Sequence, residues 1–327
     1  MTDQTAAATP GIVSLKAREV PPPAALSEAA RAVLAAVVPL GAPMPAVADK
    51  DAWRRLIAQR EVSGAQMRES LMARLRADVT AEPKAGVPVY VGKPQGERFL
   101  GDDKVVFDIH GGALLFGGGE GSVRFEAAAI SLRTGRLTYA LDYRVPPDGA
   151  YPAALDDCMA VYKALLAERP ASQIVLCGTS AGGNLAAALL LRAKDEGLPM
   201  PAGALLMTPE LDLTESGDTF HTLMGLDTVL TSRLTAMNEV YADGADLAHP
   251  YLSPLFGDVA GFPPTLLQAG ARDIFLSNAI LMHRKLRKAG VRAELHVWEG
   301  MPHSGFGGVT PEDREVNAEM QAFIGSL

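Results

Sequence analysis

The sequence of 327 residues contains only two cysteines, Cys158 and Cys177, and only 6% aromatic side chains. Two cysteines cannot build a disulfide framework, and Cys177 lies inside an apolar run typical of a buried strand. We therefore expect two buried thiols and no disulfide. This cysteine usage fits a reducing compartment, and we expect the protein in the cytoplasm.

The chain also lacks an excess of positive charge. Its 30 Lys and Arg residues stand against 38 Asp and Glu residues, so the formal net charge is −8. A nucleic-acid-binding surface needs a basic face, so this composition argues against nucleic acid as a partner. It also mildly disfavours acidic substrates.

Long hydrophobic runs are missing too. No stretch approaches the roughly twenty uninterrupted apolar residues that a membrane-spanning helix needs. Residues 1–10 show no positive cluster followed by an apolar run, so we expect no secretory signal. The chain is nevertheless 48% hydrophobic and 21% charged, which is typical of a globular protein. At this length we expect one large core with a smaller cap.

The N-terminal quarter differs in pattern from the rest. Residues 1–23 are rich in Ala, Thr and Pro and are expected to form a flexible tail. Apolar residues then recur at helical spacing over 26–38 and again over 51–79, with a break near 63–64. Residues 24–84 are therefore predicted to form an N-terminal helical cap segment.

From residue 85 to residue 327, short apolar runs alternate with helical stretches. The expected strands are 87–91, 105–109, 137–141, 174–177, 204–207, 265–269 and 293–298. The expected helices are 124–133, 153–168, 185–194, 278–289 and 311–324. This alternation predicts an α/β fold with a mostly parallel central sheet flanked by helices on both faces. A second cap insertion, at about 210–250, holds a further expected helix at 231–241.

Ser180 lies in the hexapeptide GTSAGG, residues 178–183, between an expected buried strand and an expected helix. On such a tight turn the serine hydroxyl is pushed out of the strand ladder towards solvent. The following helix begins beside the serine, so its free amides lie where an oxyanion would form. Taken alone, the motif is equally consistent with an ordinary glycine turn. Its place between strand and helix favours a nucleophile.

A nucleophilic serine needs a base to accept its proton and a third group to orient that base. Asp273 falls just past the expected strand 265–269, and His303 falls just past 293–298. No other histidine follows the final strand. Asp273 by itself would more readily be a turn residue. The order Ser, Asp, His is that of α/β-hydrolases, so Ser180, Asp273 and His303 are predicted to form a catalytic triad.

A second set of oxyanion donors is expected after strand 105–109. The consecutive Gly111 and Gly112 can turn backbone amides inward without a side-chain clash. The predicted donors are the amides of Gly111, Gly112 and Ala181, with His110 in a supporting structural role. The histidines and cysteines show none of the usual metal-ligand spacings, so we expect neither a metal nor another cofactor.

Seven motifs in a fixed order carry a family resemblance. They are HGGA at 110–113, DYR at 142–144 before PP at 146–147, YPAAL at 151–155, GTSAGGNLA at 178–186, SPL at 253–255, AG at 269–270 with Asp273, and GMPH at 300–303. The chain, over about residues 87–310, resembles the hormone-sensitive lipase family of α/β-hydrolase carboxylesterases, in the branch with GTSAGG. That resemblance implies the same triad and oxyanion hole, and a cap built from the two segments named above.

Two positions depart from the family pattern. Ala113 stands where the family usually has a third glycine, and Ile274 stands where proline commonly follows the acid. Neither change removes a group that the mechanism needs.

The resemblance implies a serine carboxylic ester hydrolase that forms an acyl-enzyme on a small-molecule ester. Apolar residues at 220–226 in the cap favour short to medium acyl chains. A lactone hydrolase with the same machinery is the nearest alternative, and a non-catalytic small-molecule receptor on the same fold is a more distant one. A homodimer through the last strand or the terminal helix is also consistent with the residues.

Overall fold

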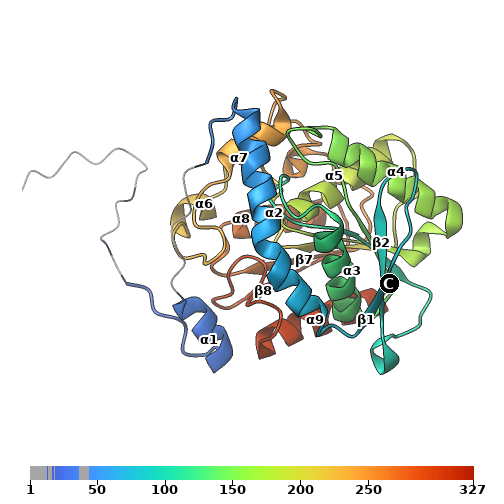
Figure 1. Ribbon diagram of the computed structural model, residues 1–327, viewed down its shortest axis with the longest axis horizontal. Coiled ribbons are helices and arrows are strands. Elements are labelled where there is room, and N and C mark those ends of the chain that lie inside the picture. The colour runs from blue at the N-terminus through green and yellow to red at the C-terminus, as the bar shows by residue number, and fades with distance from the viewer. Residues whose placement is uncertain (1–12, 14–16, 18, 37–43) are drawn as a thin grey trace, which may run out of the picture.

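In the computed structural model, eight strands of the described residues form one sheet in the order β1-β2-β4-β3-β5-β6-β7-β8 (Figure 1). The described residues are 13, 17, 19–36 and 44–327. The strands are β1 (Ala77–Ala81), β2 (Val89–Pro94), β3 (Val105–Ile109), β4 (Thr138–Leu141), β5 (Ile174–Thr179), β6 (Gly203–Met207), β7 (Thr265–Gly270) and β8 (Ala293–Trp298). Strand β2 pairs antiparallel with β1 and β4, and every other pairing is parallel. The predicted mostly parallel sheet is confirmed.

Helices cover both faces of this sheet. One face is covered by α4 (Ala153–Glu168), α5 (Ala181–Asp195) and α8 (Leu276–Lys288), and the other by α3 (Glu120–Thr134) and α9 (Pro311–Gly325). Alternate side chains of β3 enter the two separate hydrophobic cores. Because both faces are buried, the central strands consist almost entirely of apolar residues. This burial is why their positions could be predicted from the sequence.

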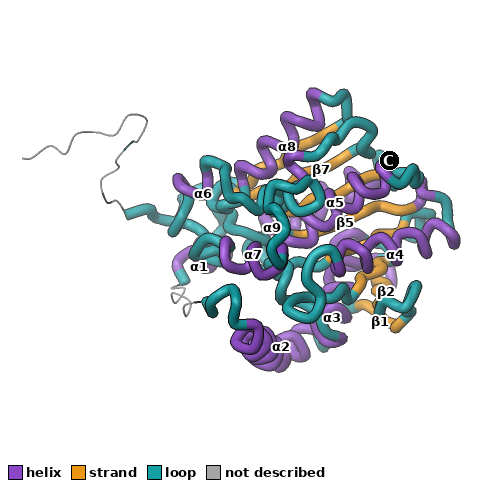
Figure 2. The backbone as a smooth tube through the Cα atoms, turned by 90° about the horizontal axis from the view of Figure 1, so that it is seen from above, coloured by secondary structure: helices purple, strands orange, loops and turns teal. Residues whose placement is uncertain are grey.

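The N-terminal segment differs from the prediction in two respects. Helix α1 spans Glu28–Ala35. Helix α2 spans Lys50–Met72 without the break predicted near 63–64, and it packs beside α3 (Figures 1 and 2). The helix predicted to reach residue 79 therefore ends earlier, and Ala77–Ala81 forms strand β1 instead. Pairing with β2 outweighs the local helical pattern because it supplies the backbone partners that the edge of the sheet would otherwise lack. The predicted tail and the end of the helix predicted to residue 38 lie largely outside the described residues.

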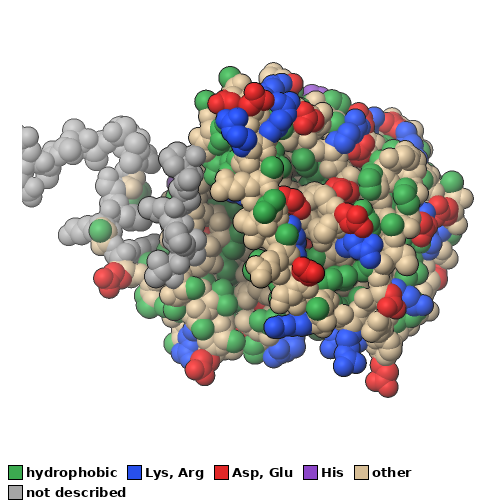
Figure 3. Space-filling view, in the orientation of Figure 1, with side chains coloured by type: hydrophobic (Ala, Val, Ile, Leu, Met, Phe, Trp, Pro, Cys, Tyr) green, Lys and Arg blue, Asp and Glu red, His purple; other side chains and the backbone are tan. Residues whose placement is uncertain are grey.

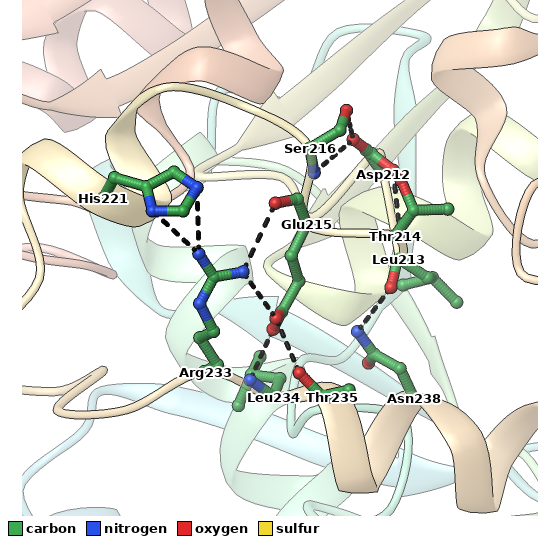
Figure 4. A network of polar contacts seen from close by, with 10 residues as sticks. All are labelled: Asp212, Leu213, Thr214, Glu215, Ser216, His221, Arg233, Leu234, Thr235 and Asn238. Carbon is green, nitrogen blue, oxygen red and sulfur yellow. Dashed lines mark hydrogen bonds and ion pairs between the residues drawn. The ribbon is translucent and has the colours of Figure 1, made fainter. Parts of the chain in front are cut away.

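The second insertion lies between β6 and β7 and contains α6 (Thr219–Thr222) and α7 (Thr235–Ala242). Two buried carboxylates organise it (Figure 4). Asp212 accepts hydrogen bonds from the backbone and hydroxyl groups of Thr214 and Ser216. Glu215 accepts from the backbone N–H of Leu234 at 2.6 Å. This contact ties residues 212–216 to the start of α7.

Both cysteines are buried and free, as expected. Burial raises the pKa of the thiols of Cys158 and Cys177, so neither carries thiolate character at neutral pH. In the described part of the chain, no helix combines the length and apolarity needed to cross a membrane.

Candidate active site

Ser180 occupies a strained turn between β5 and α5. Its backbone has φ 59° and ψ −122°, a combination that L-residues rarely adopt. The turn can form only because glycine follows two positions later: a Cβ on Gly182 would lie 1.8 Å from the carbonyl oxygen of Ile109 in β3. The chain is thus folded sharply against the end of β3. Ser180 is 7% exposed, and it lines a cavity.

Asp273 and His303 meet at the carboxyl edge of the same sheet. His303 Nδ1 lies 3.1 Å from Asp273 Oδ2, and Asp273 Oδ1 accepts the backbone N–H of Phe275 at 2.8 Å. The aspartate is completely buried, and the edge of the imidazole meets the Phe275 ring at a centroid distance of 5.1 Å. A carboxylate bonded to Nδ1 keeps that nitrogen protonated. Nε2 is then the nitrogen available to accept a proton.

His303 and Ser180 line one cavity. Among the described residues, Ser180 Oγ makes no side-chain hydrogen bond, so the contact that would join it to His303 is not formed. In enzymes without substrate, such bonds are commonly long and shorten when the reactant binds. The structure therefore brings the three predicted residues to one sheet edge and joins two of them directly.

Two further carboxyl groups face His303, and the sequence-based analysis did not identify either. Asp227 lies in the segment between β6 and β7, after α6, and Glu210 follows β6 directly. Burial and the nearby Asp273 raise the pKa of Asp227 to about 6, and burial raises the pKa of Glu210 to about 8. Glu210 lies near a strand end, a position that could have drawn attention to it, whereas no local pattern marks Asp227.

These groups set the charge state of the histidine. Burial disfavours the charged imidazolium and by itself would lower the pKa of His303. The negative charge of Asp273 and its hydrogen bond to the ring act in the opposite direction, with smaller contributions from the carboxyl groups of Asp227 and Glu210, so the pKa of His303 is raised above its ordinary value. A base with a raised pKa holds an abstracted proton more firmly.

The loop after β3 supplies amides opposite Ser180. Gly111 and Gly112 both line the cavity, and Gly112 has φ 127°, a conformation open to glycine. The next residue, Ala113, also has a positive φ of 52°, so the family's usual glycine is replaced here by a residue held in a left-handed conformation. Ala181 is fully buried directly after Ser180 at the N-terminus of α5. Its amide belongs to the first turn, where a helix leaves donors free.

His110 supports this loop from within. Its Nδ1 lies 2.7 Å from the carbonyl oxygen of Gly111, and its ring stacks on Tyr143 at a centroid distance of 4.0 Å. The Tyr143 hydroxyl in turn donates to the His110 carbonyl at 3.0 Å. Burial lowers the pKa of His110 to about 4, so the ring is neutral at physiological pH.

The cavity has a volume of about 1330 Å³. Its walls come from the loop after β3, from α2, α3 and α9, from the loop after β8 and from the segment between β6 and β7. That segment contributes Val229, Leu230, Leu234 and Met237. The apolar stretch 220–226, expected from the sequence to shape the pocket, does not line it; Phe220 packs on Phe275 instead, at a centroid distance of 5.7 Å.

Known proteins resemble the chain over most of its length. Residues 106–306 match a family described as having the alpha/beta hydrolase fold. The acetyl-hydrolase of Streptomyces hygroscopicus is 34% identical over 227 residues, which cover 68% of this chain and 76% of that protein. The crystal structure of the esterase E25 superposes with a TM-score of 0.88 at 32% identity, covering 96% of this chain and 98% of that chain.

A second crystal structure, of an esterase from the bacterial hormone-sensitive lipase family, has a TM-score of 0.75 at 28% identity and covers 92% of this chain and 98% of that chain. The chain belongs to the hormone-sensitive lipase-like family of α/β-hydrolase carboxylesterases.

Proposed function

We propose that the protein hydrolyses carboxylic esters of short to medium acyl chains through Ser180, His303 and Asp273. His303 Nε2 takes the proton of the Ser180 hydroxyl as its oxygen attacks the ester carbonyl. Asp273 holds the imidazole by its Nδ1 proton and stabilises the imidazolium that forms. The protonated imidazole then gives its proton to the leaving alcohol, and an acyl-enzyme remains on Ser180.

Water completes the cycle by the same steps. His303 removes a proton from water, the resulting hydroxide attacks the acyl carbonyl, and the acid product leaves as Ser180 regains its proton. In both halves the amides of Gly111, Gly112 and Ala181 donate to the oxyanion. The observation that carries this proposal is the strained Ser180 turn facing the same cavity as the buried His303–Asp273 pair.

The cavity walls support the proposed chain length. Leu230, Leu234 and Met237 give one side an apolar surface, and apolar residues of α3 line another part. We propose that residues 24–84 and about 210–250 together form the cap over this cavity, since both contribute to its walls. The volume leaves room for the acyl and alcohol parts of a small ester together.

Hydrolysis of p-nitrophenyl esters of increasing acyl length tests the substrate class. We expect kcat/KM to peak among short and medium chains, and a maximum at long chains would contradict the proposed length. A lactone panel run beside it separates the cyclic-ester alternative.

Labelling with an organophosphate tests the nucleophile. Mass spectrometry should find the adduct on Ser180 in the parent protein and no adduct in Ser180→Ala. The Asp273→Asn variant should lower kcat by about 10⁴ with little change in KM, because the imidazole loses its orienting charge. Labelling at another serine, or retained turnover in Ser180→Ala, would contradict the mechanism.

A further inference from the structure

Asp227 joins the cap to the loop that carries His303. Its side chain is 4% exposed, and its Oδ2 accepts the backbone N–H of His303 at 3.1 Å. Its Oδ1 accepts the N–H groups of Val229 at 2.7 Å and Leu230 at 3.1 Å. Val229 and Leu230 both line the cavity. One carboxylate therefore contacts the proposed base and the cap wall at the same time.

A purely local role explains two of these three hydrogen bonds. An aspartate that accepts N–H groups two and three residues ahead is a common way to close a turn, and Oδ1 does this. The bond from Oδ2 to His303 spans 76 residues and contributes nothing to that turn. It joins two loops that follow different strands.

Two titratable groups face Asp227, namely Asp273, after β7, and His303, after β8. Glu210, after β6, faces His303. Among the described residues, Asp227 forms no ion pair with Lys or Arg. Its two carboxylate oxygens accept three backbone N–H groups.

We propose that Asp227 is a positioning residue through which the cap holds His303 in place and adds negative charge next to it. This inference rests on the proposed role of His303 as the base. Asp273 holds the imidazole ring of His303 at Nδ1. Asp227, from the cap, holds the backbone N–H of His303. With both anchors in place the ring has little freedom to turn away from Ser180, and the cap wall moves together with the base.

The pH dependence of Asp227→Asn distinguishes this role from a merely structural one. The negative charge of Asp227 raises the pKa of His303, so its removal should lower that pKa. Since the neutral imidazole is the active form, the acidic limb of kcat/KM should move to lower pH by about one unit. An asparagine can accept at only one of the two positions, so kcat should also fall about tenfold or more. Activity on p-nitrophenyl butyrate between pH 4 and 9 measures both effects.

Asp212→Asn is the matched control. Asp212 is likewise a buried cap carboxylate, and it accepts four hydrogen bonds within 212–216, but none from His303. It should change stability or KM and leave the acidic limb where it is. Asp227→Glu keeps the charge in a longer side chain, so kcat should fall while the limb stays near its original pH.

An Asp227→Asn profile that overlies the parent with kcat within twofold, or an Asp227→Glu acidic limb displaced as far as that of Asp227→Asn, would overturn the inference. Both results require active parent enzyme. They are thus distinct from failure of the proposed function, in which the parent hydrolyses no ester and Ser180 is not labelled.

Discussion

Gly182 shows how the turn at Ser180 depends on the absence of one side chain. The carbonyl oxygen of Ile109 would lie 1.8 Å from a Cβ at this position, and that oxygen belongs to backbone that cannot swing aside. Gly182→Ala should therefore lower the free energy of unfolding by about 3 kcal/mol and abolish activity, as the turn must open. Urea unfolding measures the first effect, and p-nitrophenyl butyrate hydrolysis the second.

Gly121 is the control for that substitution. A Cβ there would meet nothing within 4 Å, and the residue lies in the first turn of α3. Gly121→Ala should leave activity unchanged and stability equal or slightly higher, because alanine loses less entropy in a helix. Equal unfolding midpoints for the two variants would refute the steric argument.

Glu210 should make the stability of the protein depend on pH. It is fully buried, and neither side-chain oxygen has a partner among the described residues. Burial raises its pKa from an ordinary value of 4.5 to about 8. Between these values the unfolded chain has lost the proton that the folded chain keeps, so Glu210 makes stability fall by roughly 1.4 kcal/mol per pH unit as pH rises.

Glu210→Gln removes this titration. We expect the variant to gain stability relative to the parent as pH rises from 5 to 8, because glutamine is neutral throughout. Thermal or urea unfolding at several pH values would show the two stability curves converging or crossing. The exposed Glu239 of α7 supplies the control Glu239→Gln, which should run parallel to the parent. Parallel curves for Glu210→Gln would contradict the prediction.

At the scale of elements, α7 depends on a residue far from it in the chain. The N-cap residue of α7 is Leu234, whose own side chain makes no capping hydrogen bond. Glu215 stabilises this end of the helix instead, because it accepts the Leu234 N–H and the Thr235 hydroxyl, the latter at 2.7 Å. Arg233 pairs with the same carboxylate at 3.3 Å (Figure 4). Because Leu234 and Met237 line the cavity, this one carboxylate affects the shape of the pocket.

Glu215→Gln should loosen the cap without touching the reacting groups. The amide nitrogen would face another donor, so the free energy of unfolding should fall by about 1 to 3 kcal/mol. KM should rise severalfold while kcat stays close to that of the parent. Asp243→Asn is the control, since the Asp243–Lys50 ion pair is about half exposed on both sides and such pairs contribute less than about 1 kcal/mol. A change in kcat alone would speak against this account.

For the molecule as a whole the net charge is negative, whereas the charged side chains that line the cavity are mostly positive. The chain carries a net charge of −8, and on the face shown in Figure 3 acidic and basic side chains are interspersed. The cavity, in contrast, is lined by five arginines and only two acidic residues. These are Arg60, Arg68, Arg98, Arg133 and Arg314, against Glu126 and Asp313.

The local charge should decide how anionic esters react. The Debye length is about 10 Å at 0.1 M salt, so the distant negative charges are screened more than the arginines in the cavity. For a mono-p-nitrophenyl ester of glutarate, kcat/KM should fall several-fold when ionic strength rises from 0.02 to 0.5 M. Neutral p-nitrophenyl butyrate, measured in parallel, should change little. A rise with salt for the anionic ester would mean that net charge dominates.

The central sheet, most of the helices that cover it and the residues at its carboxyl edge could be predicted from the amino-acid pattern alone. Runs such as β3 are buried on both faces, so they must be apolar, and that requirement is visible locally. Ser180, Asp273 and His303 follow such runs directly. Their position at one edge of the sheet was predictable because the parallel strands all end at that edge, and each of these residues follows a strand end.

Which residues surround that edge depends on contacts between distant parts of the folded chain. Strand β1 formed where the local pattern indicated helix, because an unpaired edge of the sheet was available to it. The contact of Asp227 with His303 links the cap to the loop after β8 across 76 residues, and no periodicity records such a distance. Burial by the completed fold likewise raised the pKa of Glu210, since loss of water around a carboxyl group depends on everything packed against it.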